Sequence, residues 1–167
     1  MASDEEIKAQ FWKELEASPF VMLGIDGERG AATQPMTAQF EEQQSPLWFF
    51  TANDHDLVRA LGAGDGNGGD RAIATFASKG HDIFASLRGR LSQDNDPAVI
   101  DRLWNPIVAQ WYEGGKSDPK LALLRLDIED AKIWKSDISG FLKPAINKLF
   151  GRKPEAGQSE KVAEVTL

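Results

Sequence analysis

LWNPIVAQWYEGGKSDPKLALLRLDIEDAKIW, residues 103–134, contains three of the five tryptophans of the 167-residue chain. A helix-like run ends in a Gly-Gly turn, and an Asp-Pro pair then leads into an alternating, strand-like stretch that ends at Trp134. Tryptophan is large, and the face of its ring suits flat aromatic partners. Next to strands, such a cluster is either part of an ordinary core or one wall of a site for a planar ligand.

Length and composition bound the class of protein. With 41% hydrophobic and 27% charged residues, the chain is expected to form a single globular domain around one core. Its formal charge of -7 is opposite to the basic surface that nucleic-acid backbones require, so nucleic acid is not expected as a partner. The lack of cysteine excludes disulfides, thiolate nucleophiles and Cys-based zinc sites.

The N-terminal segment MASDEEIKAQ is acidic and lacks the basic start and apolar run of a signal peptide. No apolar run reaches the roughly 18 residues that a membrane-spanning helix requires. We therefore expect a cytoplasmic protein that has no membrane partner.

The expected elements are hairpins of strands joined by short helices. Ser3 and Glu6 form a capping box for a helix to about residue 17, and Asp96-Pro97 begins another that ends near Asn105. A second short helical piece is expected to carry Trp111. Strands are expected at residues 20–25, 31–40, 47–51, 71–77, 82–91, 121–127, 131–135 and 162–167, a helix at 139–150, and a mobile segment at 151–160. This pattern favours an antiparallel sheet closed into a barrel, with helices packed outside.

Motifs for metal or nucleophilic chemistry are lacking. No HxH or HExxH pair accompanies His55 and His81, so no metal is expected. His81 fits a solvated turn and a ligand contact equally well. The glycine-rich residues 62–69 lack the GK[ST] ending of a phosphate-binding loop, which favours a flexible loop. No residue stands out as an acid or base, so the catalytic residues are unknown.

Two segments, QPMTAQ (residues 34–39) and WFFT (residues 48–51), could lie on adjacent strands. Met36 and Phe50 would then follow one wall, with free backbone groups near Pro35, which cannot donate to a ladder. A flat polar ring such as an isoalloxazine needs apolar faces and hydrogen bonds at its edge, which Thr37, Thr51 and the backbone could supply. From spacing alone, ordinary core packing is favoured over such a site.

Taken with RAIATFASKGHDIFASLRG and the Trp-rich segment, these segments resemble the bacterial general stress protein 26 group. That group belongs to the FMN-binding split-barrel superfamily related to pyridoxamine 5'-phosphate oxidase, and the similarity covers about residues 11–134. The resemblance implies a mainly β fold with α-helices, a six-stranded antiparallel Greek-key split barrel with peripheral helices, as one domain over residues 1–167. It also implies a homodimer that binds FMN, or FAD, at the dimer interface.

The resemblance also assigns residues to the flavin site. It places near the flavin Gln34, Pro35, Met36, Thr37, Phe49, Phe50 and Thr51, with Lys79 and Ser78 near the phosphate and Trp104, Trp111 and Trp134 near the ring or the dimer seam. Many relatives have Arg at the position of Gln34 and Lys at that of Leu57, and both cations help to hold the FMN phosphate. Charge-assisted contacts are about twice as strong as neutral ones. Lys79, Arg88 or Arg59 could compensate for their loss.

The leading hypothesis is a flavin-binding general stress protein; if it is an enzyme, it would be an oxidoreductase in which the flavin transfers hydride or electrons to or from an unknown small molecule. Pyridoxamine 5'-phosphate oxidase activity itself is not expected, because no basic cluster suits the phosphate of that substrate. The alternatives are a non-enzymatic flavin carrier or sensor, a dimeric stress protein without cofactor, and a reductase that uses the related deazaflavin.

Overall fold

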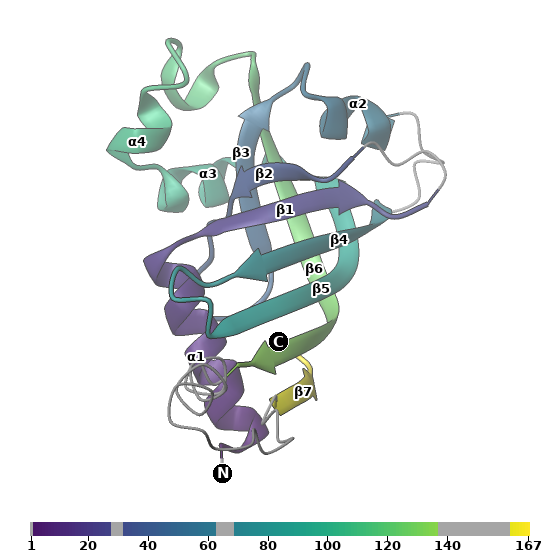
Figure 1. The fold of residues 1–167 in the computed structure, drawn as a ribbon. Helices are drawn as coiled ribbons and strands as arrows, with labels where there is room; N and C mark the ends of the chain where they lie inside the picture. The colour runs from purple at the N-terminus through teal and green to yellow at the C-terminus, as the bar shows by residue number, and fades with distance from the viewer. Residues whose placement is uncertain (1, 28–31, 63–68, 137–160) are drawn as a thin grey trace, which may run out of the picture.

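The computed structural model describes residues 2–27, 32–62, 69–136 and 161–167. One antiparallel sheet forms its centre, with helices at its end and beside it (Figure 1). The strands are β1 (Phe20–Ile25), β2 (Gln34–Thr37), β3 (Leu47–Ala52), β4 (Asp70–Ala77), β5 (Ile83–Gln93), β6 (Leu121–Lys135) and β7 (Lys161–Val165). The helices are α1 (Asp4–Ala17), α2 (Asp56–Gly62), α3 (Pro97–Leu103) and α4 (Pro106–Ala109), with a 3-10 turn η1 (Gly115–Ser117).

Local sequence signals at the two ends of the chain are confirmed. The Ser3 hydroxyl accepts a hydrogen bond from the Glu6 N–H, and the Glu6 carboxylate accepts one from the Ser3 N–H, which completes the capping box. The predicted terminal strand corresponds to β7, which pairs with the end of β6. The helix predicted at residues 139–150 and the mobile segment predicted at 151–160 lie outside the described residues.

β6 organises the sheet because both of its edges are paired. One edge pairs with β5 along nearly its whole length, and the other pairs with β3 at its start and β7 at its end. The prediction of two separate strands, at 121–127 and 131–135, is wrong. A bulge opposite Arg88 and Gly89 accommodates the polar residues between these ranges, so the pairing continues through them.

The sheet is open between its end strands, β2 and β3. In the order β2-β1-β4-β5-β6-β3, a bridge between Gln39 and Trp48 is the only backbone pairing that joins the two ends within the described ranges. The predicted closed barrel is therefore corrected to a split one. β2 has four residues, fewer than predicted for 31–40, and Pro35 within it has no N–H for a ladder.

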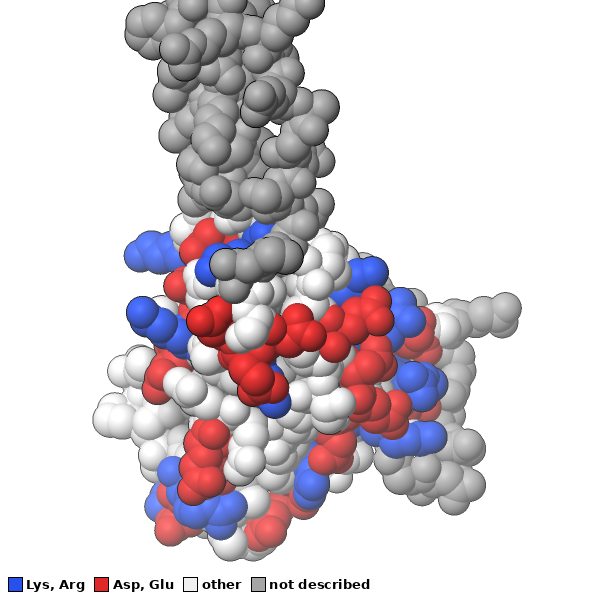
Figure 2. All heavy atoms as spheres, turned by 90° about the horizontal axis from the view of Figure 1, so that it is seen from below, with Lys and Arg blue, Asp and Glu red and all other residues white. Residues whose placement is uncertain are grey.

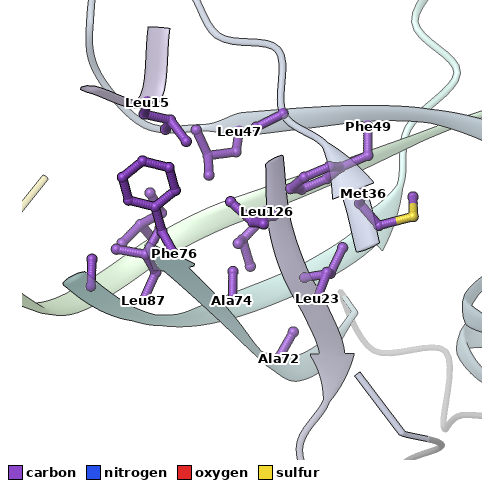
Figure 3. Packing of buried hydrophobic residues seen from close by; sticks show 14 of the residues in the cluster. Leu15, Leu23, Met36, Leu47, Phe49, Ala72, Ala74, Phe76, Leu87 and Leu126 are labelled. Atoms are coloured by element: carbon purple, nitrogen blue, oxygen red, sulfur yellow. The ribbon is translucent and has the colours of Figure 1, made fainter. Parts of the chain in front are cut away.

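The main core lies on the concave side of the sheet, with α1 packed at one end. Ile7, Phe11 and Leu15 form the predicted apolar face of α1, and Trp12 is buried with them. Side chains from several strands meet beside this helix (Figure 3), among them Leu23, Met36, Phe49, Ala74, Phe76, Leu87 and Leu126. Each large apolar side chain buried here contributes about 1.5–3 kcal/mol to folding.

A second apolar cluster lies on the opposite face of β3 and β6, beneath the α3–α4 excursion. It comprises Trp48, Phe50, Val99, Ile100, Leu103, Val108, Tyr112, Leu121 and Leu123, with Trp104 packed against it. Successive residues of β3 therefore point into different cores, as strand alternation requires.

The α3–α4 excursion begins and turns where its sequence indicates. Asp96 caps α3 with Pro97 at the first helical position, and the helix ends at Leu103, close to the predicted end near Asn105. Asn105 caps α4, accepting hydrogen bonds from two backbone N–H groups. The helical position predicted for Trp111 is wrong: α4 ends at Ala109, and Trp111 follows in a tight turn.

Charged side chains are unevenly spread over the end of the molecule that carries α1. Figure 2, viewed from below Figure 1, shows acidic side chains in a broad band, with basic side chains in smaller groups beside it. The acidic share of this face agrees with the formal charge of -7.

Candidate functional site

The split between β2 and β3 is a gap with hydrogen-bonding edges on both sides. Gln39 and Trp48 exchange two backbone hydrogen bonds of 2.7 Å each, and the ladder stops there. If the β2–β3 ladder continued, its next hydrogen-bonded pair would be Thr37 and Phe50, each two residues further along its strand. These residues belong to no β2–β3 ladder among the described residues. We call this opening the β2–β3 gap.

Backbone alternation shows which groups face the β2–β3 gap. The Ala38 N–H donates to the Pro19 carbonyl at 2.7 Å, so the backbone of Ala38 faces β1. Hydrogen-bonding groups alternate along a strand, so those of Thr37 face the other way, into the gap. By the same rule Phe50 shares the direction of Trp48. A carbonyl and an N–H on each side are therefore available to the edge of a ligand.

An aromatic triad of Phe50, Trp104 and Tyr112 stands behind the β3 side of this gap. The Phe50 ring meets that of Trp104 edge-on, with centroids 6.1 Å apart, and the Trp104 and Tyr112 centroids are 6.0 Å apart. Trp104 is only partly buried, so part of its ring remains accessible. Aromatic pairs in these geometries add about 0.5–1.5 kcal/mol beyond burial.

Tyr112 ties the triad to β3. Its hydroxyl donates to the Thr51 carbonyl at 2.7 Å. Burial, with a smaller contribution from the negative charge of Asp118, raises the pKa of Tyr112 to about 12. The phenol therefore stays protonated and keeps this hydrogen bond. The sequence shows a tyrosine among the tryptophans but carries no signal for its contact with β3.

The turn that follows Tyr112 is held by Asp118. Its carboxylate accepts hydrogen bonds from the backbone N–H groups of Lys120 and Gly114, and these bonds hold the pKa of Asp118 below its ordinary value. Gly114 itself is crowded, since an added Cβ would lie 3.1 Å from Asp118. The GGKSDP motif thus fixes where the excursion rejoins the sheet.

The structure brings together only part of the predicted site. Pro35 and Thr37 of β2 and Phe50 of β3 lie at the β2–β3 gap, with the Trp104 ring against that of Phe50, whereas the backbone of Thr51 is turned toward β6. Met36 points into the main core, and Gln34 shares its face of β2. Phe49 is fully buried in the main core, so its ring is turned away from Phe50. Trp111 is 55% exposed beyond α4, and Trp134 lies at the far end of β6 beside β7.

Ser78 and Lys79 lie in the turn of the β4–β5 hairpin. The Ser78 hydroxyl donates to the Asp82 carboxylate at 2.7 Å and accepts from the N–H groups of Asp82 and Ile83. Ser78 therefore has a structural role in the turn. Lys79 is exposed at the tip, followed by His81 with a positive φ of 58°.

The outer face of the sheet carries exposed apolar side chains. Phe20 is 62% exposed, and Met22 on the same face of β1 is also exposed. Phe84, Trp134 and Val162 continue this surface as directly opposed residues on β5, β6 and β7. Apolar side chains gathered in this way mark interaction surfaces more often than isolated ones do. We call this surface the outer apolar row.

Within the described ranges, no group of three or more His, Asp or Glu side chains is placed to hold a metal ion. None of the described helices is long and apolar enough to cross a membrane.

The antiparallel order, the β2–β3 gap and the outer helices define a split barrel of the pyridoxamine 5'-phosphate oxidase type. The family model described as "Pyridoxamine 5'-phosphate oxidase like" matches residues 6–155. The chain therefore belongs to this family, as the resemblance in its sequence predicts.

Solved structures of general stress proteins are similar to this chain. A general stress family protein from Xanthomonas campestris pv. campestris is 55% identical, with a TM-score of 0.73 and coverage of 82% of this chain and 92% of that one. The general stress FMN/FAD binding protein from Xanthomonas citri is 53% identical, with a TM-score of 0.70 and coverage of 78% and 89%. A general stress protein 26 from Jannaschia sp. CCS1 is 28% identical, with a TM-score of 0.74 and coverage of 98% and 99%. The search of curated proteins gave no match.

Proposed function

We propose that this protein binds a flavin nucleotide, FMN or FAD, with the ring system at the β2–β3 gap. The facing open edges at Thr37 and Phe50 carry this proposal, because a flavin ring presents both donors and acceptors along one edge. The partly exposed Trp104 supplies an apolar surface nearby. The 53% identity to an FMN/FAD binding protein supports the same conclusion.

The residues present fit the ring better than the phosphate. Gln34 is neutral, and Leu57 is 2% exposed within the main core, so neither position offers a cation. His55 lies directly before α2, and its Nδ1 accepts a hydrogen bond from the Leu57 N–H at 3.2 Å, so this nitrogen is already bonded to the helix backbone. We therefore expect the phosphate to add less to affinity here than in relatives that carry both cations.

We further propose a homodimer that forms through the outer apolar row. Phe20, Met22, Phe84 and Val162 are all exposed in the single chain, and a second copy would cover them. The row ends at β1, where Phe20 lies opposite Thr37 of β2, so a dimer formed there would place a second chain beside the β2–β3 gap. The gap would then become an enclosed pocket, of the kind that binds most of a ligand's surface.

Oxidoreductase activity toward a small molecule is the first form that this function could take. A bound flavin would supply hydride or electron transfer, and this chain would position and shield it. Thr37 and Phe50 would orient the ring edge through backbone groups, while the aromatic triad would keep water from one side.

A flavin carrier or sensor is the second candidate. Near the gap, the described residue with a strongly shifted pKa is Tyr112, and its shift makes the phenol a weaker acid. Its hydroxyl is moreover committed to the Thr51 carbonyl. This arrangement provides stability at the gap but no ready proton donor.

The visible spectrum of the purified protein, followed by titration with FMN, FAD and riboflavin, tests flavin binding. We expect quenching of flavin fluorescence that saturates at one flavin per chain. A colourless protein that quenches the fluorescence of none of the three flavins would overturn the proposal. Selective binding of a deazaflavin would show that a deazaflavin, and not FMN or FAD, is the cofactor. Anaerobic addition of NADH or NADPH then separates the candidates, because bleaching of the flavin indicates redox competence.

A further inference from the structure

A cavity of about 510 Å³ lies on the outer face of β5, β6 and β7, away from the β2–β3 gap. Side chains that line it include Ser86, Arg88, Lys132, Trp134 and Glu164. The strand register places Ser86 opposite Lys132, and Lys132 opposite Glu164, so these three share one row across the sheet. The cavity therefore combines two cations, a hydroxyl and an indole ring with the carboxylates of Asp130 and Glu164.

Arg88 differs from most other arginines of the described chain in having no ion pair there. Arg71 and Arg90 contact Glu129, Arg102 contacts Glu41, and Arg125 contacts Asp94 and Asp127. Arg59, on α2, has no ion pair either but does not line this cavity. Arg88 is held on a fully paired strand, directly before the bulge at Gly89. Asp130 lies directly opposite Arg88 on β6, but the two form no ion pair in the described structure. A guanidinium that a rigid strand presents in this way is suited to an external anion.

Lys132 can contribute to the same anion. Its Nζ lies 3.5 Å from the Glu164 carboxylate, but the Glu164 side chain is 79% exposed. Such exposed pairs contribute little, so a phosphate could draw Lys132 away at small cost. The Nζ also lies 5.6 Å from the centre of the Trp134 ring, so the cation and the aromatic surface are adjacent.

We propose that this cavity binds the phosphate of a nucleotide, with Arg88 as the principal contact, Lys132 as the second, and Trp134 beside the organic part. Two sources share this chemistry: the phosphate end of FMN, and an adenine nucleotide such as part of a dinucleotide electron donor. The FMN source rests on the proposed function and on the proposed dimer, because the cavity lies away from the β2–β3 gap of its own chain and would meet the phosphate of an FMN bound at the gap of the second copy. It would there replace the cations that are lacking at Gln34 and Leu57. The carboxylates of Asp130 and Glu164 also line the cavity, so affinity depends on the guanidinium rather than on net charge.

The test compares Arg88→Ala and Arg88→Lys with Lys13→Ala, which removes one exposed positive charge on α1, outside the cavity. Binding of FMN, riboflavin and AMP is measured by calorimetry for each protein. If the phosphate belongs to FMN, Arg88→Ala weakens FMN about tenfold, the effect of one lost charge-assisted contact, and changes riboflavin less than about twofold. Arg88→Lys falls between, and AMP competes with FMN but not with riboflavin.

If the source is a separate nucleotide, AMP binds together with FMN, and Arg88→Ala removes AMP binding while FMN is unaffected. Unchanged FMN and AMP binding in Arg88→Ala overturns the inference, as does an equal loss for FMN and riboflavin. Riboflavin has the flavin ring but no phosphate, so its binding to the unaltered protein tests the proposed flavin site independently of the phosphate site. If neither flavin binds, the proposed function fails, and the AMP measurements alone then show whether the cavity binds a nucleotide phosphate.

Discussion

Tyr112 is the only tyrosine of the chain, so its ionisation can be followed directly. Its side chain is 5% exposed, and its hydroxyl donates to the Thr51 carbonyl. Burial raises its pKa to about 12 from an ordinary value of 10.0. We therefore predict that native Tyr112 stays protonated well above pH 10.

The size of this effect follows from the pKa shift. A rise of about two units corresponds to roughly 3 kcal/mol of difference between the two protonation states. Because the pKa is higher in the folded protein, the stabilisation is fully present below pH 10 and is lost as the pH rises toward 12. Tyr112→Phe should remove this alkaline dependence and should cost about 1 kcal/mol at neutral pH through the lost hydrogen bond.

Tyrosinate absorbance, titrated in native and in urea-unfolded protein, measures both pKa values. Circular dichroism at each pH establishes that the native sample is still folded, and Tyr112→Phe supplies the blank. We expect a native midpoint near pH 12 and an unfolded midpoint near pH 10. A native midpoint near pH 10 with the fold intact would refute the buried, hydrogen-bonded placement of Tyr112.

Three further perturbations test the fold, the phosphate end and the dimer. Gly89→Ala should destabilise the protein by at least about 3 kcal/mol in urea unfolding, because the new Cβ would lie 1.9 Å from the Asp127 carbonyl oxygen. Gly80→Ala, whose Cβ would have 3.4 Å to its nearest neighbour, should cost less than about 1 kcal/mol, and equal losses would contradict the bulge geometry. Gln34→Arg should strengthen FMN about tenfold relative to riboflavin in fluorescence titrations, and an equal change for both would separate Gln34 from the phosphate. Phe20→Glu should yield a folded monomer in analytical ultracentrifugation, whereas an unchanged dimer would exclude Phe20 from the interface.

The elements that the sequence predicts well are those set by local chemistry. The Ser3–Glu6 capping box and the Asp96-Pro97 helix start depend on residues within one turn of each other. The β4–β5 hairpin is similarly local, since Ser78 bonds to residues four and five positions away. Such features need no knowledge of the rest of the chain.

The errors arise where distant segments decide the outcome. The polar residues after Ile128 indicate the end of a strand, but the bulge opposite Gly89 lets β6 continue. Likewise, the apolar run of β1 does not reveal that Phe20 and Met22 lie on an uncovered face. Whether the barrel closes depends on how far β2 continues to pair. Pro35 is the one residue in this segment whose chemistry indicates that the pairing is limited.

The Trp-rich segment shows the same contrast between local sequence signals and distant contacts at the candidate site. Trp104 and Tyr112 lie together behind β3, as an aromatic wall requires, and Trp134 lies across the sheet beside β7. Sequence proximity cannot separate these positions, because β6 runs 15 residues from one region to the other. The family resemblance supplied the fold, while the arrangement of the gap and the cavity required the structure.

Residue-resolved amide exchange, with and without riboflavin, tests most directly whether the β2–β3 gap holds a flavin ring. The free protein should exchange quickly at the Thr37 and Phe50 amides, which face the gap, and slowly at the Met36 amide, which faces β1. Riboflavin should slow exchange at Thr37 and Phe50 and leave Met36 unchanged. Riboflavin that binds without protecting either amide would contradict the proposed site.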